Sequence, residues 1–367
     1  MFIAMTISIA GCGDGSTESD AANALFTYRG KSEKFDEIFR RNGPLTLSES
    51  KDVLNVAPEI TLDGDVVWAS DPEETQVRKY NRQGELIFAF GKRGQGPGEL
   101  DQPIQAVPLG GDTLLVLDRG QVPQMVLYDT AGDTARFIGS VNRPTEVRDV
   151  HMLAKLSDGR FAVAAGWQSL RVPMGVDIGE ITEIREGAGS RFVGAFSELG
   201  LVRGVPSELV RTYMAFAQTV VGARDSLLFV AAMMQDTITV YNVNSDAQRS
   251  FALPTQNFRP FIPYPDNAAL MSVREWRAAF SVIDKIFAVS DSVLVVQFAD
   301  IDIHNRQTLF TLVGVDFDGR RLFEINRAPR LLAWDDDAAI FVGIRENDLL
   351  PSHMAWYSIR GVNAKER

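Results

Sequence analysis

The sequence predicts an all-β fold, a six-bladed β-propeller with two loop or helix insertions, and two observations support this. A polar turn followed by an apolar, β-rich strand recurs six times along the chain. The turns also recur at a regular spacing, with steps of 47, 47, 66, 66 and 46 residues between them. The equivalent turn positions are Asp65, Asp112, Gly159, Asp225, Asp291 and Asp337. Because a four-stranded blade needs about 40 to 50 residues, each copy predicts one blade.

The first two copies show the strand pattern most clearly. The first predicts strands at 60–62, 66–69, 77–80 and 86–90, and the second at 106–109, 114–117, 125–128 and 137–139. The other copies predict strands at 161–164, 227–230, 239–242, 293–296, 340–343 and 356–359. We expect either residues 45–47 or residues 25–28 to join the last blade and close the ring.

Two steps are longer than the others by about twenty residues. The segments 197–216 and 254–280 lack the strand pattern, so they are the predicted insertions. A β-sandwich would share the short strands and turns. It would not explain why the step returns to 46 or 47 residues after each interruption.

The composition excludes some classes of function. The chain carries 48 acidic and 37 basic residues, a net charge of −11, and has no Lys/Arg run that could neutralise a phosphate backbone, so we predict no nucleic-acid partner. Its single cysteine rules out an intrachain disulfide. Beyond the N-terminal segment, no apolar run approaches the roughly 18 residues that a transmembrane helix needs.

The N-terminal segment is apolar from Phe2 to Ala10 and leads into Ile9-Ala10-Gly11-Cys12. This tetrapeptide resembles the lipobox of bacterial lipoproteins, which implies lipidation at Cys12. We expect a signal peptide at 1–12, a polar tether at 13–24 and the propeller at 25–362. The resemblance implies a cell-envelope protein held by lipid, at the outer membrane and facing the periplasm. No basic residue precedes Arg29, so a truncated leader, or a buried strand with an unpaired cysteine, stays an alternative.

A glycine-rich segment, Gly91 to Pro103, joins the first two copies. Its sequence, Gly-Lys-Arg-Gly-Gln-Gly-Pro-Gly-Glu-Leu-Asp-Gln-Pro, resembles the blade junction of bacterial six-bladed β-propeller lipoproteins related to NHL-repeat propellers. A phosphate-binding loop would open a helix, but here Pro97 and Pro103 bracket Gly98-Glu99-Leu100-Asp101 and no helical period follows. We therefore predict a tight turn that uses glycine for positive φ.

Candidate catalytic groups are few. The chain has no His-Glu-x-x-His or Gly-x-Ser-x-Gly motif. Asp300, Asp302 and His304 alternate along a predicted strand and would share one face, where they could bind a divalent metal. A half-solvated strand shows the same alternation. His151 and His353 are the other histidines, and none of the three occupies a repeated position.

The insertions are the predicted binding regions, because propeller loops gather on one face. The candidate contact residues are Arg203, Arg211, Tyr213, Phe258, Arg259, Phe261, Tyr264 and Trp276. Exposed aromatic and arginine side chains suit recognition of a protein, peptide or carbohydrate. The second insertion could equally fold down and plug the central channel.

These observations favour a monomeric, non-enzymatic binding or scaffold module anchored to the membrane by lipid. No cofactor is predicted, although a divalent metal is compatible with the Asp300 group. The alternative is a metal-assisted lyase or hydrolase of the NHL-propeller type that uses the central channel. A structural propeller within a larger envelope complex is the third interpretation.

Overall fold

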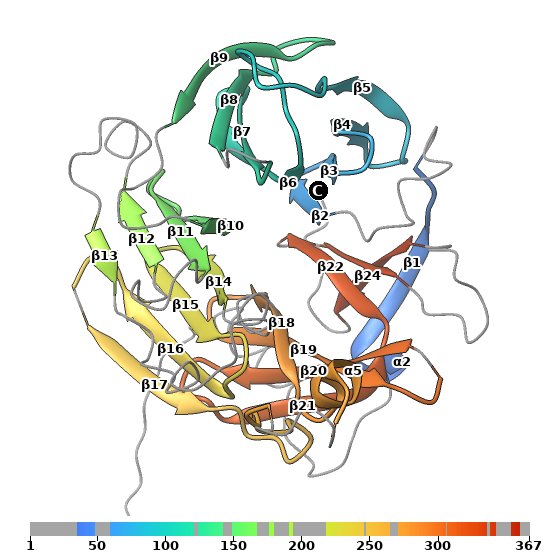
Figure 1. The fold of residues 1–367 in the computed structure, drawn as a ribbon, viewed down its shortest axis with the longest axis vertical. Helices are drawn as coiled ribbons and strands as arrows, with labels where there is room; N and C mark the ends of the chain where they lie inside the picture. Colours follow the sequence, from blue (N-terminus) through green and yellow to red (C-terminus); the bar gives the residue numbers. More distant parts are fainter. Residues whose placement is uncertain are drawn as a thin grey trace, which may run out of the picture.

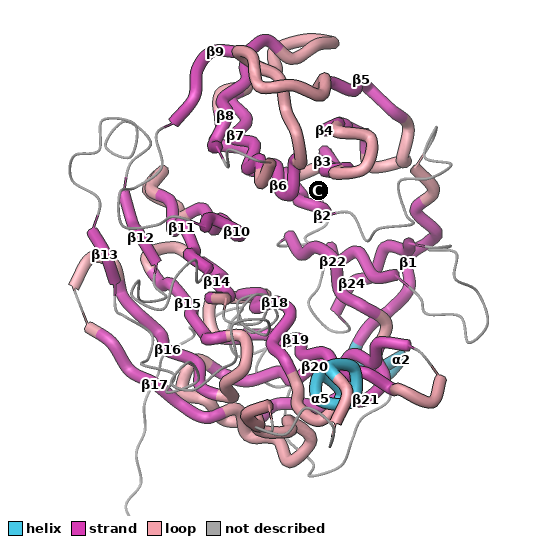
Figure 2. The backbone as a smooth tube through the Cα atoms, viewed as in Figure 1, coloured by secondary structure: helices cyan, strands magenta, loops and turns pink. Residues whose placement is uncertain are grey.

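The computed structural model describes residues 35–47, 59–120, 124–141, 149–166, 176–179, 191–193, 218–245, 247–264, 271–305, 307–335, 338–342 and 354–359. This part of the chain forms six antiparallel four-stranded sheets. The sheets are arranged around a common centre as a β-propeller (Figure 1). The tube drawing shows how little helix accompanies these strands (Figure 2). The predicted all-β propeller is therefore confirmed.

The first three sheets follow one another along the chain. Sheet 1 contains β2 (Glu59–Asp63), β3 (Val66–Asp71), β4 (Gln76–Asn81) and β5 (Leu86–Phe90). Sheet 2 contains β6 (Pro103–Gly110), β7 (Thr113–Asp118), β8 (Gln124–Asp129) and β9 (Arg136–Val141). Sheet 3 contains β10 (Asp149–Lys155), β11 (Phe161–Gly166), β12 (Val176–Gly179) and β13 (Arg191–Val193).

The remaining sheets complete the ring. Sheet 4 contains β14 (Thr219–Arg224), β15 (Leu227–Ala232), β16 (Thr237–Asn242) and β17 (Gln248–Ala252). Sheet 5 contains β18 (Val282–Ala288), β19 (Val293–Asp302), β20 (Gln307–Asp316) and β21 (Arg321–Ala328). Sheet 6 contains β22 (Arg330–Asp335), β23 (Ala338–Val342), β24 (Met354–Ile359) and β1 (Phe39–Leu45). The short helices are α2 (Phe35–Ile38) and α5 (Val273–Ala278).

Sheet 6 closes the ring with strands from both ends of the chain. The N-terminal strand β1 pairs antiparallel with β24, from Phe39 opposite Ile359 to Leu45 opposite Met354. The closing strand is Phe39–Leu45. It begins six residues before the predicted segment 45–47, of which only Leu45 lies in the strand. Residues 25–28, the alternative closing segment, lie outside the described residues.

The core lies between neighbouring sheets, because each sheet is apolar on both faces. Between sheets 1 and 2, for example, Trp68, Val77 and Phe88 pack with Leu114 and Val116. The repeat also holds at the turns from the first to the second strand. Asp112, Gly159 and Asp225, three of the turn positions taken as equivalent, all have positive φ. Asp and Gly tolerate this conformation, which explains their recurrence there.

The two ends of the ring carry different connections. In sheets 1 to 5 the chain runs from the innermost to the outermost strand, so the loop to the next sheet lies at the end where the innermost strands begin (Figure 1). We call this end the loop face and the opposite end the turn face. Helix α2 lies at the turn face, because it leads directly into β1, whose first residue Phe39 pairs with Ile359 at the end of β24. Ile38 belongs to the same buried cluster as Val289 and Val293, which flank the turn between β18 and β19. The second insertion connects β17 to β18, so its described residues, 254–264 and 271–280, lie at the loop face.

Candidate functional site

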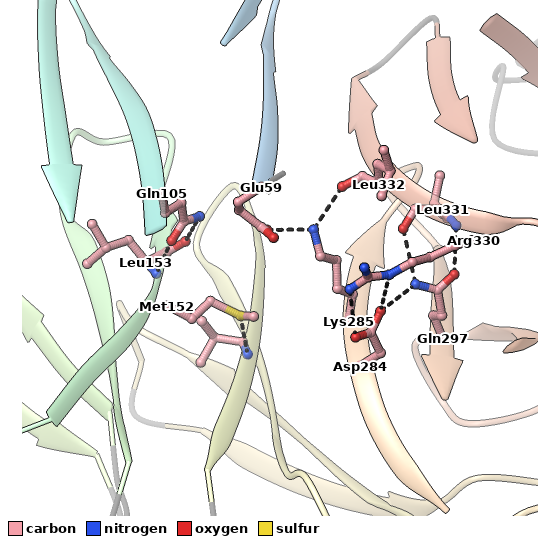
Figure 3. Close-up of polar contacts among 11 residues, drawn as sticks. Glu59, Gln105, Met152, Leu153, Asp284, Lys285, Gln297, Arg330, Leu331 and Leu332 are labelled. Atoms are coloured by element: carbon pink, nitrogen blue, oxygen red, sulfur yellow. Dashed lines mark hydrogen bonds and ion pairs between the residues drawn. The ribbon is translucent and has the colours of Figure 1, made fainter. Parts of the chain in front are cut away.

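Polar side chains gather where the innermost strands begin (Figure 3). We call Glu59, Asp284, Lys285, Gln297 and Arg330 the axial cluster. The Lys285 Nζ atom lies 2.5 Å from Glu59 Oε1 and donates to the Leu332 carbonyl oxygen at 2.9 Å. Lys285 is almost fully buried, since only 8% of its side chain is exposed. A single ammonium group thus joins the innermost strands of sheets 5, 6 and 1.

Two further contacts join sheet 5 to sheet 6. Gln297 is fully buried, and its side-chain amide accepts from the Leu331 N–H at 2.7 Å and donates to the Leu331 carbonyl at 3.1 Å. Arg330 holds Asp284 with two nitrogens, at 3.0 and 3.2 Å from the two carboxylate oxygens. Burial alone would lower the pKa of Arg330, but the charge of Asp284 and its hydrogen bond outweigh burial and raise it. Arg330 therefore stays protonated and paired.

Side chains also bond the backbone of the next sheet between sheets 2 and 3 and between sheets 3 and 4. The Gln105 amide accepts from the Leu153 N–H at 2.8 Å and donates to the Leu153 carbonyl at 3.1 Å. The Met152 sulfur accepts from the Val221 N–H at 3.4 Å. Gln105, Met152 and Lys285 each follow a register shift in the innermost strand, at 103/105, 150/152 and 283/285. A β-bulge redirects a side chain, and here it aims one at the backbone of the next sheet.

The axial cluster is therefore better suited to holding sheets together than to chemistry. An innermost strand has an unpaired edge, and its N–H and C=O groups need partners. The side chains of the preceding sheet supply them. Each charged member of the cluster faces an opposite charge, Lys285 with Glu59 and Arg330 with Asp284. A general base or nucleophile needs a group that is available to a substrate, and these ion pairs occupy the four charged groups.

The second insertion folds onto sheets 4 and 5. We call its described residues, 254–264 and 271–280, the cap. Arg259 forms an ion pair with Asp300 at 2.6 Å and donates to the Ala278 carbonyl, while Ser281 also donates to Asp300, at 2.7 Å. Glu324, buried on β21, accepts from the Thr255 hydroxyl at 2.9 Å. These contacts fix both ends of the cap to sheet 5.

The aromatic side chains of the cap form its interior. The Trp276 indole donates to the Ile262 carbonyl at 2.8 Å, and its ring lies 5.0 Å from that of Phe280 and 6.0 Å from that of Phe261. The Tyr264 hydroxyl donates to the Met271 carbonyl at 2.6 Å. This packing is typical of edge-to-face aromatic clusters.

This packing corrects the expected exposure of the candidate contact residues. Trp276 and Phe258 are buried, and Phe261 and Tyr264 are half-buried, because they fill the space between the cap and sheets 4 and 5. Arg259 is paired with Asp300. The side chains that the sequence marks as binding groups thus hold the cap in place. Arg203, Arg211 and Tyr213 lie outside the described residues, as does Cys12.

The expected metal group does not form either. Strand β19 ends at Asp302, so His304 lies in the following turn and does not share a strand face with Asp300. Asp300 is engaged by Arg259 and Ser281. Asp302 accepts from the backbone N–H groups of Asn305 and His304, and its pKa is lowered by hydrogen bonds to Asn305 first and then to His304.

No other metal site takes its place in the described part of the chain, which contains no group of three or more His, Cys, Asp or Glu residues able to hold a metal ion. The side chain of His151 and all of His353 lie outside the description. The described residues also contain no helix that is long and apolar enough to span a membrane.

The glycine-rich junction is a tight turn, as predicted. Gly91 and Gly98 have φ of 112° and 74°, and β6 follows in place of a helix. Leu100 is fully buried between sheets 1 and 2. The Asp118 carboxylate, at the end of β7, accepts from the backbone N–H groups of Asp101 and Gln102. The junction is thus held from within sheet 2.

Gly98 gives a direct test of this junction. Its carbonyl accepts from the Tyr128 hydroxyl at 2.9 Å, and a Cβ atom there would lie 2.7 Å from Phe137 Cβ. Gly110 also has positive φ, 95°, but a Cβ there would meet nothing within 4 Å. We expect Gly98→Ala to lower the free energy of unfolding by about 2 to 4 kcal/mol, and Gly110→Ala by about 1 kcal/mol. Equal losses in urea unfolding would show that the junction does not pack as described.

Sequence reasoning missed the structural role of the aspartates at the ends of the second strands, including Asp300, which it considered only as a metal ligand. Asp118 ends β7, and Asp300 lies near the end of β19; both bind the segment that leads into the innermost strand of the same sheet. Asp71 ends β3 and is buried in an ion pair with Arg78. The signal was available, because an Asp follows the apolar strand in the first, second and fifth copies.

Comparison with known proteins bears on the fold. No protein-family model matches the sequence, and no curated protein matches it either. One similar solved structure is a member of the DUF4221 family from Bacteroides vulgatus, with a TM-score of 0.61 and 9% identity over 88% of this chain and 98% of that chain. Another is a protein from Bacteroides fragilis that is provisionally assigned as exported. Its TM-score is 0.56, with 12% identity over 90% of this chain and 98% of that chain. Such similarity shows the fold alone: the chain is a β-propeller.

Proposed function

We propose that this chain is a non-enzymatic binding or scaffold module of the bacterial cell envelope. In this proposal each four-stranded sheet is one blade, so the propeller has six, as in the NHL-like lipoproteins that the Gly91–Pro103 segment resembles. The observation that carries the proposal is that the charged side chains of the axial cluster are all engaged in ion pairs. Its charged side chains pair with one another and join neighbouring sheets, which favours binding by the loop face over chemistry at the centre.

The proposal includes a location and a kind of ligand. The Ile9-Ala10-Gly11-Cys12 tetrapeptide supports lipidation at Cys12 after cleavage of a signal peptide at 1–12, with residues 13–24 as the tether. The Bacteroides fragilis protein of similar fold, which is assigned as exported, is compatible with this. We propose a monomer that acts without a cofactor at the periplasmic side of the outer membrane. Its ligand would be a protein, peptide or carbohydrate.

The anchor is tested by a Cys12→Ala variant expressed in a bacterial host from the full sequence. We expect the unaltered chain to incorporate labelled palmitate and to sediment with membranes, and the variant to do neither. The lipid-anchor proposal fails if the variant and the unaltered chain show the same labelling and the same fractionation. Thermal unfolding of both proteins is the control, because Cys12 belongs to the proposed anchor and its substitution should leave stability unchanged.

A further inference from the structure

The closing strand β1 is attached at its two ends to different neighbouring sheets. Phe39, at the start of the strand, is buried in a cluster with sheet 5, where its ring lies 6.2 Å from that of Phe323. Leu45, at the end of the strand, is buried in a separate cluster with Ile60 and Val67 of sheet 1. We call Phe39 and Leu45 the two anchors. Because sheet 6 lies between sheets 5 and 1, the two anchors face opposite sides of sheet 6 (Figure 1).

A β-bulge accounts for this two-sided arrangement. The two anchors are six positions apart, so in a regular strand, where side chains alternate, they would share one face. The register of β1 shifts between Arg41 and Gly43, so Asn42 has no residue of β24 opposite it. This extra residue reverses the alternation that follows it. The neighbouring strand agrees, because Tyr357 packs with the sheet 5 cluster and Trp356 with the sheet 1 cluster.

The middle of β1 is held weakly. Between the two anchors, the exposed residues are Arg40, Arg41, Asn42 and Pro44. Pro44 has no N–H group to donate to β24, and the bulge interrupts the ladder beside it. As the outermost strand of its sheet, β1 pairs with β24 alone among the described strands. The contacts that hold the strand are thus concentrated at its ends, where Ile38 and Leu47 are also buried.

The path of the chain also distinguishes β1 from other outermost strands. In sheets 1, 2 and 5 a short turn joins the outermost strand to its neighbour, at 82–85, 130–135 and 317–320. Asn42 and Ser358, whose hydroxyl donates to the Asn42 side-chain oxygen at 3.2 Å, are 316 positions apart. A short turn keeps a released strand close to its partner, and β1 has no such turn. The pairing of β22, β23 and β24 does not depend on β1.

We propose that residues 35–47 are a strap that opens as one unit, leaving β24 and the two neighbouring sheets while the other strands stay folded. Phe35 belongs to the strap because its ring stacks on Phe39 at 4.9 Å. Regions with few buried contacts open in this way at a lower free energy than the whole protein. The strap depends on the contacts of β1 and not on the lipid anchor. In the proposed anchored protein, a pull on the tether would act on β1 before any other strand.

The test is native-state hydrogen exchange of the full-length chain, followed by mass spectrometry at urea concentrations below the unfolding midpoint. We expect the amides of 39–45 to exchange about a hundredfold or more faster than those of β7. Their exchange should depend only weakly on urea, because release of one strand exposes little surface. The matched control is β21, an outermost strand that a turn ties to β20, and it should exchange about tenfold or more slowly than β1. Equal rates and equal urea dependence in β1 and β7 would overturn the strap.

A disulfide across the two strands tests whether β1 leaves β24. In a Cys12→Ser background, Arg40→Cys/Ser358→Cys places two cysteines directly opposite each other. Opposite residues of antiparallel strands have Cα atoms about 5 Å apart, within the reach of a disulfide. We expect the oxidised variant to exchange at 39–45 about tenfold or more slowly than the same protein after reduction. Equal exchange in the two forms would show that β1 does not separate from β24.

The bulge gives a second test. Deletion of Asn42 keeps both anchors in the chain but places them on the same face of the strand, so one of them loses its cluster. We expect exchange at 39–45 to rise about tenfold or more in this variant, whereas Asn42→Ala, which keeps the extra residue, should change it less than about threefold. No rise after the deletion would contradict the two-sided attachment. The Cys12→Ala experiment decides the lipid anchor separately.

Discussion

Replacement of Glu59 by glutamine is expected to lower the free energy of unfolding by about 2 to 3 kcal/mol. The change removes the charge that faces the ammonium group of Lys285, whose side chain is 8% exposed, and leaves that ammonium without a counterion at the centre of the ring. Removal of one partner from a fully buried pair costs about 3 to 5 kcal/mol, and the 28% exposure of the Glu59 side chain places this pair below that range. Urea unfolding followed by circular dichroism measures the loss.

Two comparisons make this prediction specific. Asp65→Asn removes the same charge from an exposed pair with Arg82 and should cost less than about 1 kcal/mol. The double variant Glu59→Gln/Lys285→Met removes both charges and should be more stable than Glu59→Gln alone, because no buried ammonium remains unpaired. A Glu59→Gln loss no larger than that of Asp65→Asn would show that the axial cluster does not hold the sheets together.

Replacement of Trp276 by alanine is expected to cost about 3 to 5 kcal/mol. Its ring is fully buried among Met234, Phe280, Val282 and Phe310, which come from the cap and from sheets 4 and 5. The substitution removes this packing and the indole donor to the Ile262 carbonyl. The substitution would leave a cavity in the interface between the cap and sheets 4 and 5. We therefore expect lower global stability and faster proteolysis within 254–280.

The control for Trp276 lies on the same helix. Val273 is 40% exposed, so Val273→Ala should change the free energy of unfolding by less than about 0.5 kcal/mol. If Trp276→Ala left both urea unfolding and the proteolysis pattern of the cap unchanged, the aromatic interior described for the cap would be wrong.

Much of the fold is legible in the sequence because the repeat is local. The strands predicted at 66–69 and 114–117 lie within β3 and β7, and the turn positions Asp112 and Asp225 have the positive φ that their residue types tolerate. The turn at 91–103 was also predictable, since Pro97 and Pro103 exclude a helix there. Each of these features depends on residues close together in the chain.

The partners of the polar side chains could not be predicted in the same way. Glu59 and Lys285 are 226 positions apart, and only closure of the ring brings them together. Lys285 also needs the register shift between Ile283 and Lys285 to be aimed at sheet 6. No pattern in the sequence marks that shift, because a bulge is defined by the opposite strand.

The candidate site was misjudged where burial decided the outcome. Phe258 and Trp276 suggested a recognition surface, but the same apolar area is better used in packing the cap onto sheets 4 and 5. For Asp300, Asp302 and His304, alternation was extended beyond the end of the strand at Asp302. In both cases the residue types indicated a functional site, but in the folded protein these side chains make contacts within the propeller instead.

The central claim is that the axial cluster holds neighbouring sheets together. It is tested most directly by a double-mutant cycle in urea unfolding that compares Glu59→Gln, Lys285→Met and the double variant. We predict a coupling free energy of about 1 kcal/mol or more between the two side chains, because they form a largely buried ion pair between sheets 5 and 1. Losses that simply add, with a coupling free energy near zero, would contradict the claim.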